Sequence, residues 1–120
     1  MATIKSYTDI SQSKKLAEIL PLKSADYTHL GENEDNVLTR TYFESCSSEL
    51  KEWIGKDKMY PCWSLAALLD VLPNGIVMNK DAQNGRYHFS STYIGTSVTA
   101  DNPIDACYEM ILKLHELNLL

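Results

Sequence analysis

The 120-residue sequence lacks the features that identify several protein classes. It has no apolar run long enough to cross a membrane, and residues 1–7 carry no stretch of signal-peptide length. Its three cysteines, Cys46, Cys62 and Cys107, form an odd and widely spaced set, whereas secreted domains stapled by disulfides carry an even and denser set. We therefore expect a cytoplasmic protein with reduced thiols and no membrane partner.

The sequence also has none of the short motifs that hold nucleotides or metals. Its five glycines are isolated from one another, which argues against phosphate-binding loops, dinucleotide-binding turns and nucleophile elbows. No cysteine or histidine lies within four residues of another, so the short ligand spacing of a metal site is missing. The sequence predicts no metal and no cofactor.

Positive charge is scarce as well. Lys and Arg total 11 against 16 Asp and Glu, which gives a formal net charge of −5. An acidic chain has no general attraction for a phosphate backbone or an anionic lipid surface. A nucleic-acid partner is therefore not the main expectation.

The length and a hydrophobic content of 44% are those of one ordinary globular domain, which we expect to span residues 1–120. Three segments repeat their apolar residues with the period of a helix, namely residues 8–20, 64–72 and 103–117. The first has Thr8 as its expected N-cap and ends before Pro21. The last has Asn102 as its cap and Pro103 at the first helical position, which predicts a long C-terminal helix.

Segments with strand character fill the space between these helices. Residues 76–79 and 86–94 flank a polar loop and predict a β-hairpin, to which residues 97–99 add a short edge strand. Upstream, residues 26–30 and 37–43 are expected to pair across a polar loop. The predicted fold class is α+β, a small and mostly antiparallel sheet with two or three helices packed on it.

Two helix ends resemble each other. The segments LAEILP at 16–21 and LLDVLP at 68–73 share their pattern at an offset of 52 residues. One explanation is a duplication, which would give two helix–strand–strand units and a final helix. The other is that two amphipathic helices stopped by proline look alike by chance.

Three blocks of the sequence resemble a family of small uncharacterised proteins from gut Bacteroidetes and their phages and mobile elements. The blocks are YTDI and SKKLAEILP near the N-terminus (7–10 and 13–21), PCWSLAALL (61–69) and DNPIDAC (101–107) with the helix that follows. The resemblance implies a bacterial or phage protein. It implies no activity and carries over no catalytic residue.

Cys62 is the strongest candidate for a reactive group. It lies just before the second predicted helix, where unpaired backbone N–H groups would stabilise a thiolate. A nucleophilic thiol would also need a base, and His29, His88 or His115 would have to approach it. The structural alternative is a small apolar residue packed beside Trp63, and Cys107 on the apolar stripe of the last helix has the same explanation.

Aromatic residues are the candidates for binding. Trp53, which stands among charged residues, is the residue that we expect to face a partner, whereas Trp63 is expected in the core. In the second strand of the hairpin, Tyr87 and Tyr93 share one face with Phe89, which would suit either base stacking or a core.

These observations favour a non-catalytic accessory or interaction module that acts through a protein partner or by self-association. Two alternatives stay open. The first is a small cysteine-dependent enzyme that uses Cys62 with a histidine. The second is a single-stranded nucleic-acid binder that uses the strand from Tyr87 to Tyr93.

Overall fold

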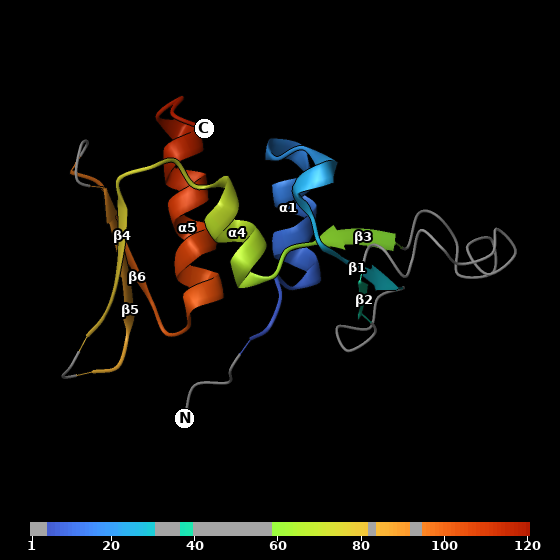
Figure 1. The fold of residues 1–120 in the computed structure, drawn as a ribbon, viewed down its shortest axis with the longest axis horizontal. Coiled ribbons are helices and arrows are strands. Elements are labelled where there is room, and N and C mark those ends of the chain that lie inside the picture. The colour runs from blue at the N-terminus through green and yellow to red at the C-terminus, as the bar shows by residue number, and fades with distance from the viewer. Residues whose placement is uncertain (1–4, 31–36, 40–58, 82–83, 92–94) are drawn as a thin grey trace, which may run out of the picture. The chain divides into compact units, whose positions relative to one another are not determined.

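A computed structural model describes residues 5–30, 37–39, 59–81, 84–91 and 95–120 of the chain. The chain divides into two compact units, whose elements are labelled in Figure 1. The N-terminal unit consists of residues 7–67, and the C-terminal unit consists of residues 68–120 together with 1–6. That residues 1–120 fold as a single domain stays a prediction.

In the described part of the N-terminal unit, one helix packs on a three-stranded antiparallel sheet. Helix α1 (Ile10–Ile19) is followed by the 3-10 turn η1 (Leu22–Ser24) and contacts strand β3. The strands are β1 (Tyr27–Leu30), β2 (Val37–Thr39) and β3 (Met59–Cys62), and β1 lies in the middle. The predicted pairing of residues 26–30 with 37–43 is thus confirmed for the part of these segments that the structure describes.

Helix α1 begins one residue later than predicted. Its N-cap is Asp9, whose carboxylate accepts a hydrogen bond from the Gln12 N–H at 2.7 Å, while the Gln12 side chain accepts one from the Asp9 N–H at 3.1 Å. This reciprocal pair is a capping box. The prediction of Thr8 as the cap is wrong, because the Thr8 side chain is buried and bonds to Ser13 and Trp63 instead.

In the C-terminal unit, the predicted hairpin and its additional strand are confirmed. Strands β4 (Ile76–Lys80), β5 (Tyr87–Ser91) and β6 (Ser97–Ala100) form an antiparallel sheet in that order, and helix α5 (Pro103–Glu116) packs on β5 and β6. Helix α4 (Leu65–Val71) precedes them in the chain, and its residues 65–67 belong to the N-terminal unit. The fold class is α+β, as predicted, with the described strands in two small antiparallel sheets and a long C-terminal helix.

Helix α5 has the ends that its sequence predicts. Asn102 accepts a hydrogen bond from the Asp105 N–H at 2.8 Å, and Pro103 occupies the first turn. Asn118 then takes the left-handed conformation, with φ of 57°, and the Leu119 N–H donates to the Leu114 carbonyl at 2.9 Å. This Schellman motif ends the helix. Leu117, which was predicted on the apolar stripe, follows the last helical residue and is 47% exposed.

The interior of the C-terminal unit is formed by one face of α5. The side chains that this helix buries are Ile104, Ala106, Cys107, Met110, Ile111 and Leu114. The sequence predicts an apolar stripe of Cys107, Met110, Ile111, Leu114 and Leu117 on this helix, and all of these except Leu117 are buried. Phe89 of β5 is fully buried as well.

Candidate functional site

Cys62 lies at the end of β3 and is fully buried. It is directly opposite Tyr27 of β1, the central strand of its sheet. A thiol at this place cannot meet a solvent-borne substrate without an opening of the unit. The structural alternative, a packed residue beside Trp63, therefore describes its surroundings better than an exposed nucleophile does.

His29 is the histidine that the fold brings nearest to Cys62 in the register of the sheet. It lies opposite Tyr60, two positions from the Tyr27–Cys62 pair, so both side chains are on the same face. The imidazole is 1% exposed, and its Nε2 donates to the Thr8 carbonyl at 2.8 Å. Because a carbonyl can only accept, this bond requires a proton on Nε2.

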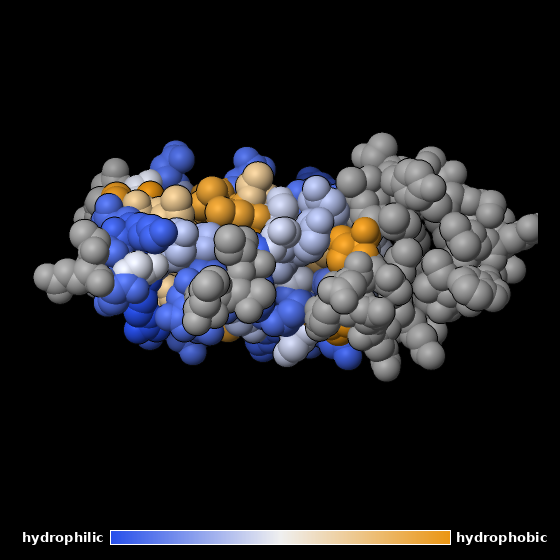
Figure 2. Space-filling model, turned by 90° about the horizontal axis from the view of Figure 1, so that it is seen from below, coloured by the Kyte–Doolittle hydropathy of each residue, from blue (hydrophilic) through white to orange (hydrophobic). Residues whose placement is uncertain are grey.

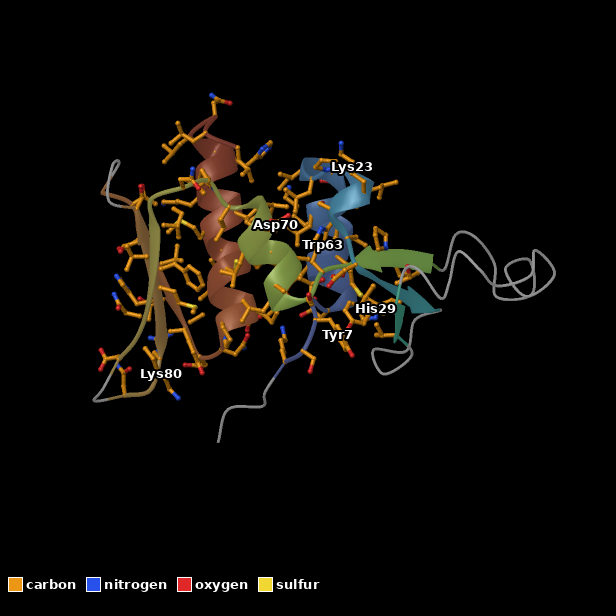
Figure 3. The ribbon with its side chains drawn as sticks, in the orientation of Figure 1. Tyr7, Lys23, His29, Trp63, Asp70 and Lys80 are labelled. Carbon is orange, nitrogen blue, oxygen red and sulfur yellow. The ribbon has the colours of Figure 1, made fainter. Side chains whose placement is uncertain are left out.

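Trp63 connects several segments of the N-terminal unit, as Figure 3 shows with Tyr7 and His29 nearby. Its backbone N–H donates to the Thr8 Oγ1 at 3.1 Å, and its carbonyl accepts from the Thr8 N–H at 3.0 Å. Its indole Nε1 donates to the Ser24 Oγ at 2.9 Å. Trp63 is fully buried, so the prediction that it belongs to the core is confirmed.

A second polar contact, which the sequence did not predict, fixes the start of α4. The Asp26 carboxylate accepts from the Ser64 N–H at 2.9 Å and from the Ser64 hydroxyl. The Ser64 Oγ in turn accepts from the Ala67 N–H at 3.3 Å. A serine bonded to a carboxylate is one part of a hydrolytic site, but here the hydroxyl caps a helix, and His29 is engaged with Thr8.

Cys107 is buried on α5, as predicted. Burial away from water raises the pKa of its thiol from 9.0 to about 12, because the thiolate would lose its hydration. This cysteine stays a neutral thiol at neutral pH. It therefore packs as a small apolar residue rather than acting as a nucleophile.

The aromatic strand faces α5. Phe89 is fully buried, and the half-buried Tyr87 lies two residues away on the same face, with the Lys80 ammonium 5.4 Å from the centre of its ring. Tyr93 and Trp53, the other predicted binding residues, lie outside the described residues. Of the aromatic side chains on this face, the described ones are Tyr87 and Phe89, and both contribute to the core rather than to an exposed stacking surface.

The opposite face of this sheet is polar and open to water. His88 of β5 lies between Asn79 and Thr99, and its Nδ1 shares a hydrogen bond of 3.0 Å with the Thr99 Oγ1. Serines 90 and 97 occupy the next cross-strand row with Val77. The sheet thus has one face covered by α5 and one face in solvent.

Strand β4 is the most exposed element of the sheet. All four residues from Val77 to Lys80 are exposed, with Val77 at 39% and Met78 at 45%. Met78 is on the α5 side, since it pairs with the buried Phe89, but α5 packs on β5 and β6. The apolar side chain of Met78 therefore extends past the helix that covers the rest of this face.

The hydrogen-bonding groups of β4 also point outward. The Asp81 N–H donates to the Arg86 carbonyl at 2.7 Å, so Asp81 and Arg86 form a hydrogen-bonded pair. Such pairs alternate along an antiparallel ladder, which turns the groups of Val77 and Asn79 toward β5. The N–H and C=O groups of Ile76, Met78 and Lys80 then face the other way, where no strand among the described residues pairs with β4.

Exposed apolar residues elsewhere are scattered. Hydrophilic residues predominate on the coloured part of the face shown in Figure 2, and apolar residues gather in small groups. In the C-terminal unit, the exposed large apolar side chains besides those of β4 are Leu69, Leu117, Leu119 and Leu120. Only on β4 do such side chains accompany an unpaired strand edge within the described part of this unit.

Comparison of the chain with models of protein families finds no match, and neither the curated proteins nor the solved structures compared with it give one. The resemblance to proteins of gut Bacteroidetes and their phages stays a prediction. No helix within the described ranges is long and apolar enough to span a membrane. Within the same ranges, no three side chains of His, Cys, Asp or Glu gather as a metal site requires.

Proposed function

We propose that the protein is a non-catalytic interaction module of the cytoplasm, which acts through a protein partner or by self-association. The observation that carries this proposal is the edge of β4, where exposed apolar side chains accompany outward-facing backbone groups. An open strand edge is a template for one more strand. Backbone hydrogen bonds then provide the affinity, and the side chains on either side provide selectivity.

The candidate reactive groups support the same proposal by their surroundings. Cys62 and Cys107 are both buried, and burial raises the pKa of the Cys107 thiol. His29 donates to a backbone carbonyl instead of facing solvent. These side chains are packed in the interiors of the two units, whereas Val77 to Lys80 of β4 are exposed to solvent.

A photo-crosslinking amino acid at position 78 tests the proposal. In bacterial cells that produce the protein and in the purified protein at high concentration, we expect a covalent adduct with another polypeptide chain. The same amino acid at Ser97, an exposed position of the opposite edge strand β6, is the matched control and should give much less. Absence of any adduct at position 78 under both conditions would contradict the proposal.

The cysteine-dependent alternative makes the opposite prediction for thiol chemistry. A buried Cys62 should react with iodoacetamide only as fast as the protein opens, and much faster in urea. Rapid alkylation of Cys62 in the native protein, with a thiol pKa well below about 8.5, would favour the enzyme. The Cys62→Ala variant identifies the signal that belongs to this thiol.

A further inference from the structure

We infer that the partner of β4 is β4 of a second copy of this chain, paired antiparallel about a two-fold axis that passes beside Met78. This inference rests on the proposed function and names its partner. The two sheets would continue into one sheet of six strands. Both copies of α5 would then lie on the same face, since a two-fold axis perpendicular to a sheet preserves its faces.

The backbone of β4 suits this pairing over its whole length. The outward groups belong to Ile76, Met78 and Lys80, which are every second residue of the strand. In the proposed register Met78 lies opposite its own copy, and Ile76 lies opposite Lys80 of the other chain. Each of these three pairs exchanges two hydrogen bonds, so the outward N–H and C=O groups of the strand are all satisfied.

The charges of β4 select this register among its neighbours. A centre at Lys80 would place two ammonium groups opposite each other, and a centre at Asn79 would pair only residues 78–80 of the strand. A centre at Val77 would pair only residues 76–78, because Gly75, with φ of 90°, belongs to the turn that precedes the strand. The centre at Met78 pairs all five residues and opposes no like charges.

The side chains of β4 match in the same arrangement. The two Met78 side chains meet on the α5 side, where each is 45% exposed in the single chain. On the other face, Val77 lies beside Asn79 of the second copy. The aliphatic stem of Lys80 covers Ile76 while its ammonium stays near the Tyr87 ring, 5.4 Å from the centroid.

The size of this contact predicts a weak dimer. A strand of five residues is about 17 Å long. An interface of that length buries less than the roughly 1,200 Å² of a stable complex. We therefore expect a dissociation constant on the order of 100 μM, which is reached at high local concentration.

Charge exchange at position 78 tests the two-fold axis. Sedimentation of the wild-type chain should show reversible dimers, whereas M78E and M78K alone should each dimerise about tenfold more weakly, because like charges meet at the axis. An equal mixture of M78E and M78K should recover the dimer. The same exchange at Thr99, an exposed residue of β6, should leave dimerisation unchanged and is the control.

Disulfide formation tests the register. With Cys46 replaced by serine and oxidised glutathione as the oxidant, Met78→Cys should give covalent dimers, because paired Cα atoms about 5.5 Å apart suit a disulfide. Val77→Cys should give few, since two Val77 residues would be offset along the strands. Efficient cross-linking of Val77→Cys, or no recovery in the M78E and M78K mixture, would overturn the inference.

The two proposals fail differently. If the photo-crosslinker at position 78 captures another protein but never a second copy, the inference is wrong and the proposed function stands. If it captures no chain at all, both are wrong. Circular dichroism of each variant must match that of the wild type, so that a folding defect is not mistaken for lost association.

Discussion

The described strands of the two units form sheets with different strand orders. Among the described residues, strands β1 to β3 follow α1 in the N-terminal unit, and strands β4 to β6 follow α4, whose residues 68–71 belong to the C-terminal unit. In the first unit the earliest strand is central, with the order β2-β1-β3, whereas in the second the strands lie in sequence order. A tandem duplication would give both sheets the same strand order. The likeness of residues 16–21 to 68–73 is therefore better explained by two helices that both stop at proline.

The units also differ in what they bury. Among the described residues, four of the five buried polar side chains belong to the N-terminal unit, namely Thr8, Ser13, Thr28 and His29. The fifth, Asn102, caps α5, whose other buried side chains are apolar. In its described part, the N-terminal unit thus adds hydrogen bonds between distant residues to its buried apolar side chains, whereas the C-terminal unit is held mainly by apolar area.

The largest expected effects come from matched core truncations in the two units. Leu16→Ala on α1 and Leu114→Ala on α5 each remove a buried side chain and leave a cavity. Each should lower the free energy of unfolding by about 2–5 kcal/mol. Urea titrations provide the measurement, followed by tryptophan fluorescence for the N-terminal unit, which holds both tryptophans, and by far-UV circular dichroism for all helices.

The same titrations test whether the units fold together. A unit of about 60 residues has a marginal core alone, so we expect each substitution to shift the fluorescence and dichroism transitions together. If Leu114→Ala shifts the dichroism transition and leaves the fluorescence transition in place, the prediction of a single domain is wrong.

A smaller effect is expected from the hydrogen bonds of the N-terminal unit. Thr8→Val keeps the shape of the side chain but removes the acceptor of the Trp63 N–H and the partner of the Ser13 hydroxyl. Leaving these buried groups unsatisfied should cost about 1–3 kcal/mol. Thr99→Val, which removes an exposed hydroxyl bonded to His88, is the matched control and should be nearly neutral. Equal costs for the two variants would contradict the comparison.

The pH dependence of the C-terminal unit follows from Cys107. Burial raises its pKa from 9.0 to about 12, so above about pH 9 the unfolded chain loses a proton that the folded chain keeps. Stability is therefore complete below this range and falls as the pH rises. Between about pH 8 and about pH 10 the loss should be about 1.4 kcal/mol. Urea titrations at several pH values give the free energy of unfolding of the wild type and of Cys107→Ala. The wild type should lose more of this free energy as the pH rises, and an equal loss in the two proteins would refute the prediction.

The smallest expected difference concerns the two helix caps. Asp9→Ala removes the capping box of α1 and should cost about 1 kcal/mol. Asn102→Ala should cost up to about 2 kcal/mol, because Asn102 is buried and also donates to the Asp105 carboxylate at 2.7 Å. Thermal or chemical denaturation measures both. A larger cost for Asp9→Ala would reverse the expected order.

The C-terminal unit could be predicted well because its signals are local. Asn102 and Pro103 mark the start of α5, and an apolar stripe marks its buried face. The hairpin was recognisable from a polar loop between two strand-like segments. Its exposed edge was not recognisable, because a strand's position in a sheet depends on which other strands pair with it.

The N-terminal unit was harder to predict because its contacts join distant residues. His29 and Thr8 are 21 positions apart, and Trp63 and Thr8 are 55 positions apart. Strand β3 is not predicted because it contains Pro61, a residue that sheets tolerate at an edge, and β3 is an edge strand among the described strands. Thr8 does not cap α1 because its hydroxyl bonds to the Ser13 hydroxyl and to the Trp63 N–H. The bond to Trp63 joins distant positions, so no local sequence pattern predicts it.

The bond from the Trp63 indole to Ser24 gives this unit its own spectroscopic probe. The Ser24 hydroxyl also donates to the Pro21 carbonyl, so the indole proton is protected only while η1 is formed. Its NMR resonance should exchange slowly with solvent deuterium, at a rate that reports how often this turn opens. One proton thereby records the local motion of a segment that lies 39 positions earlier in the chain.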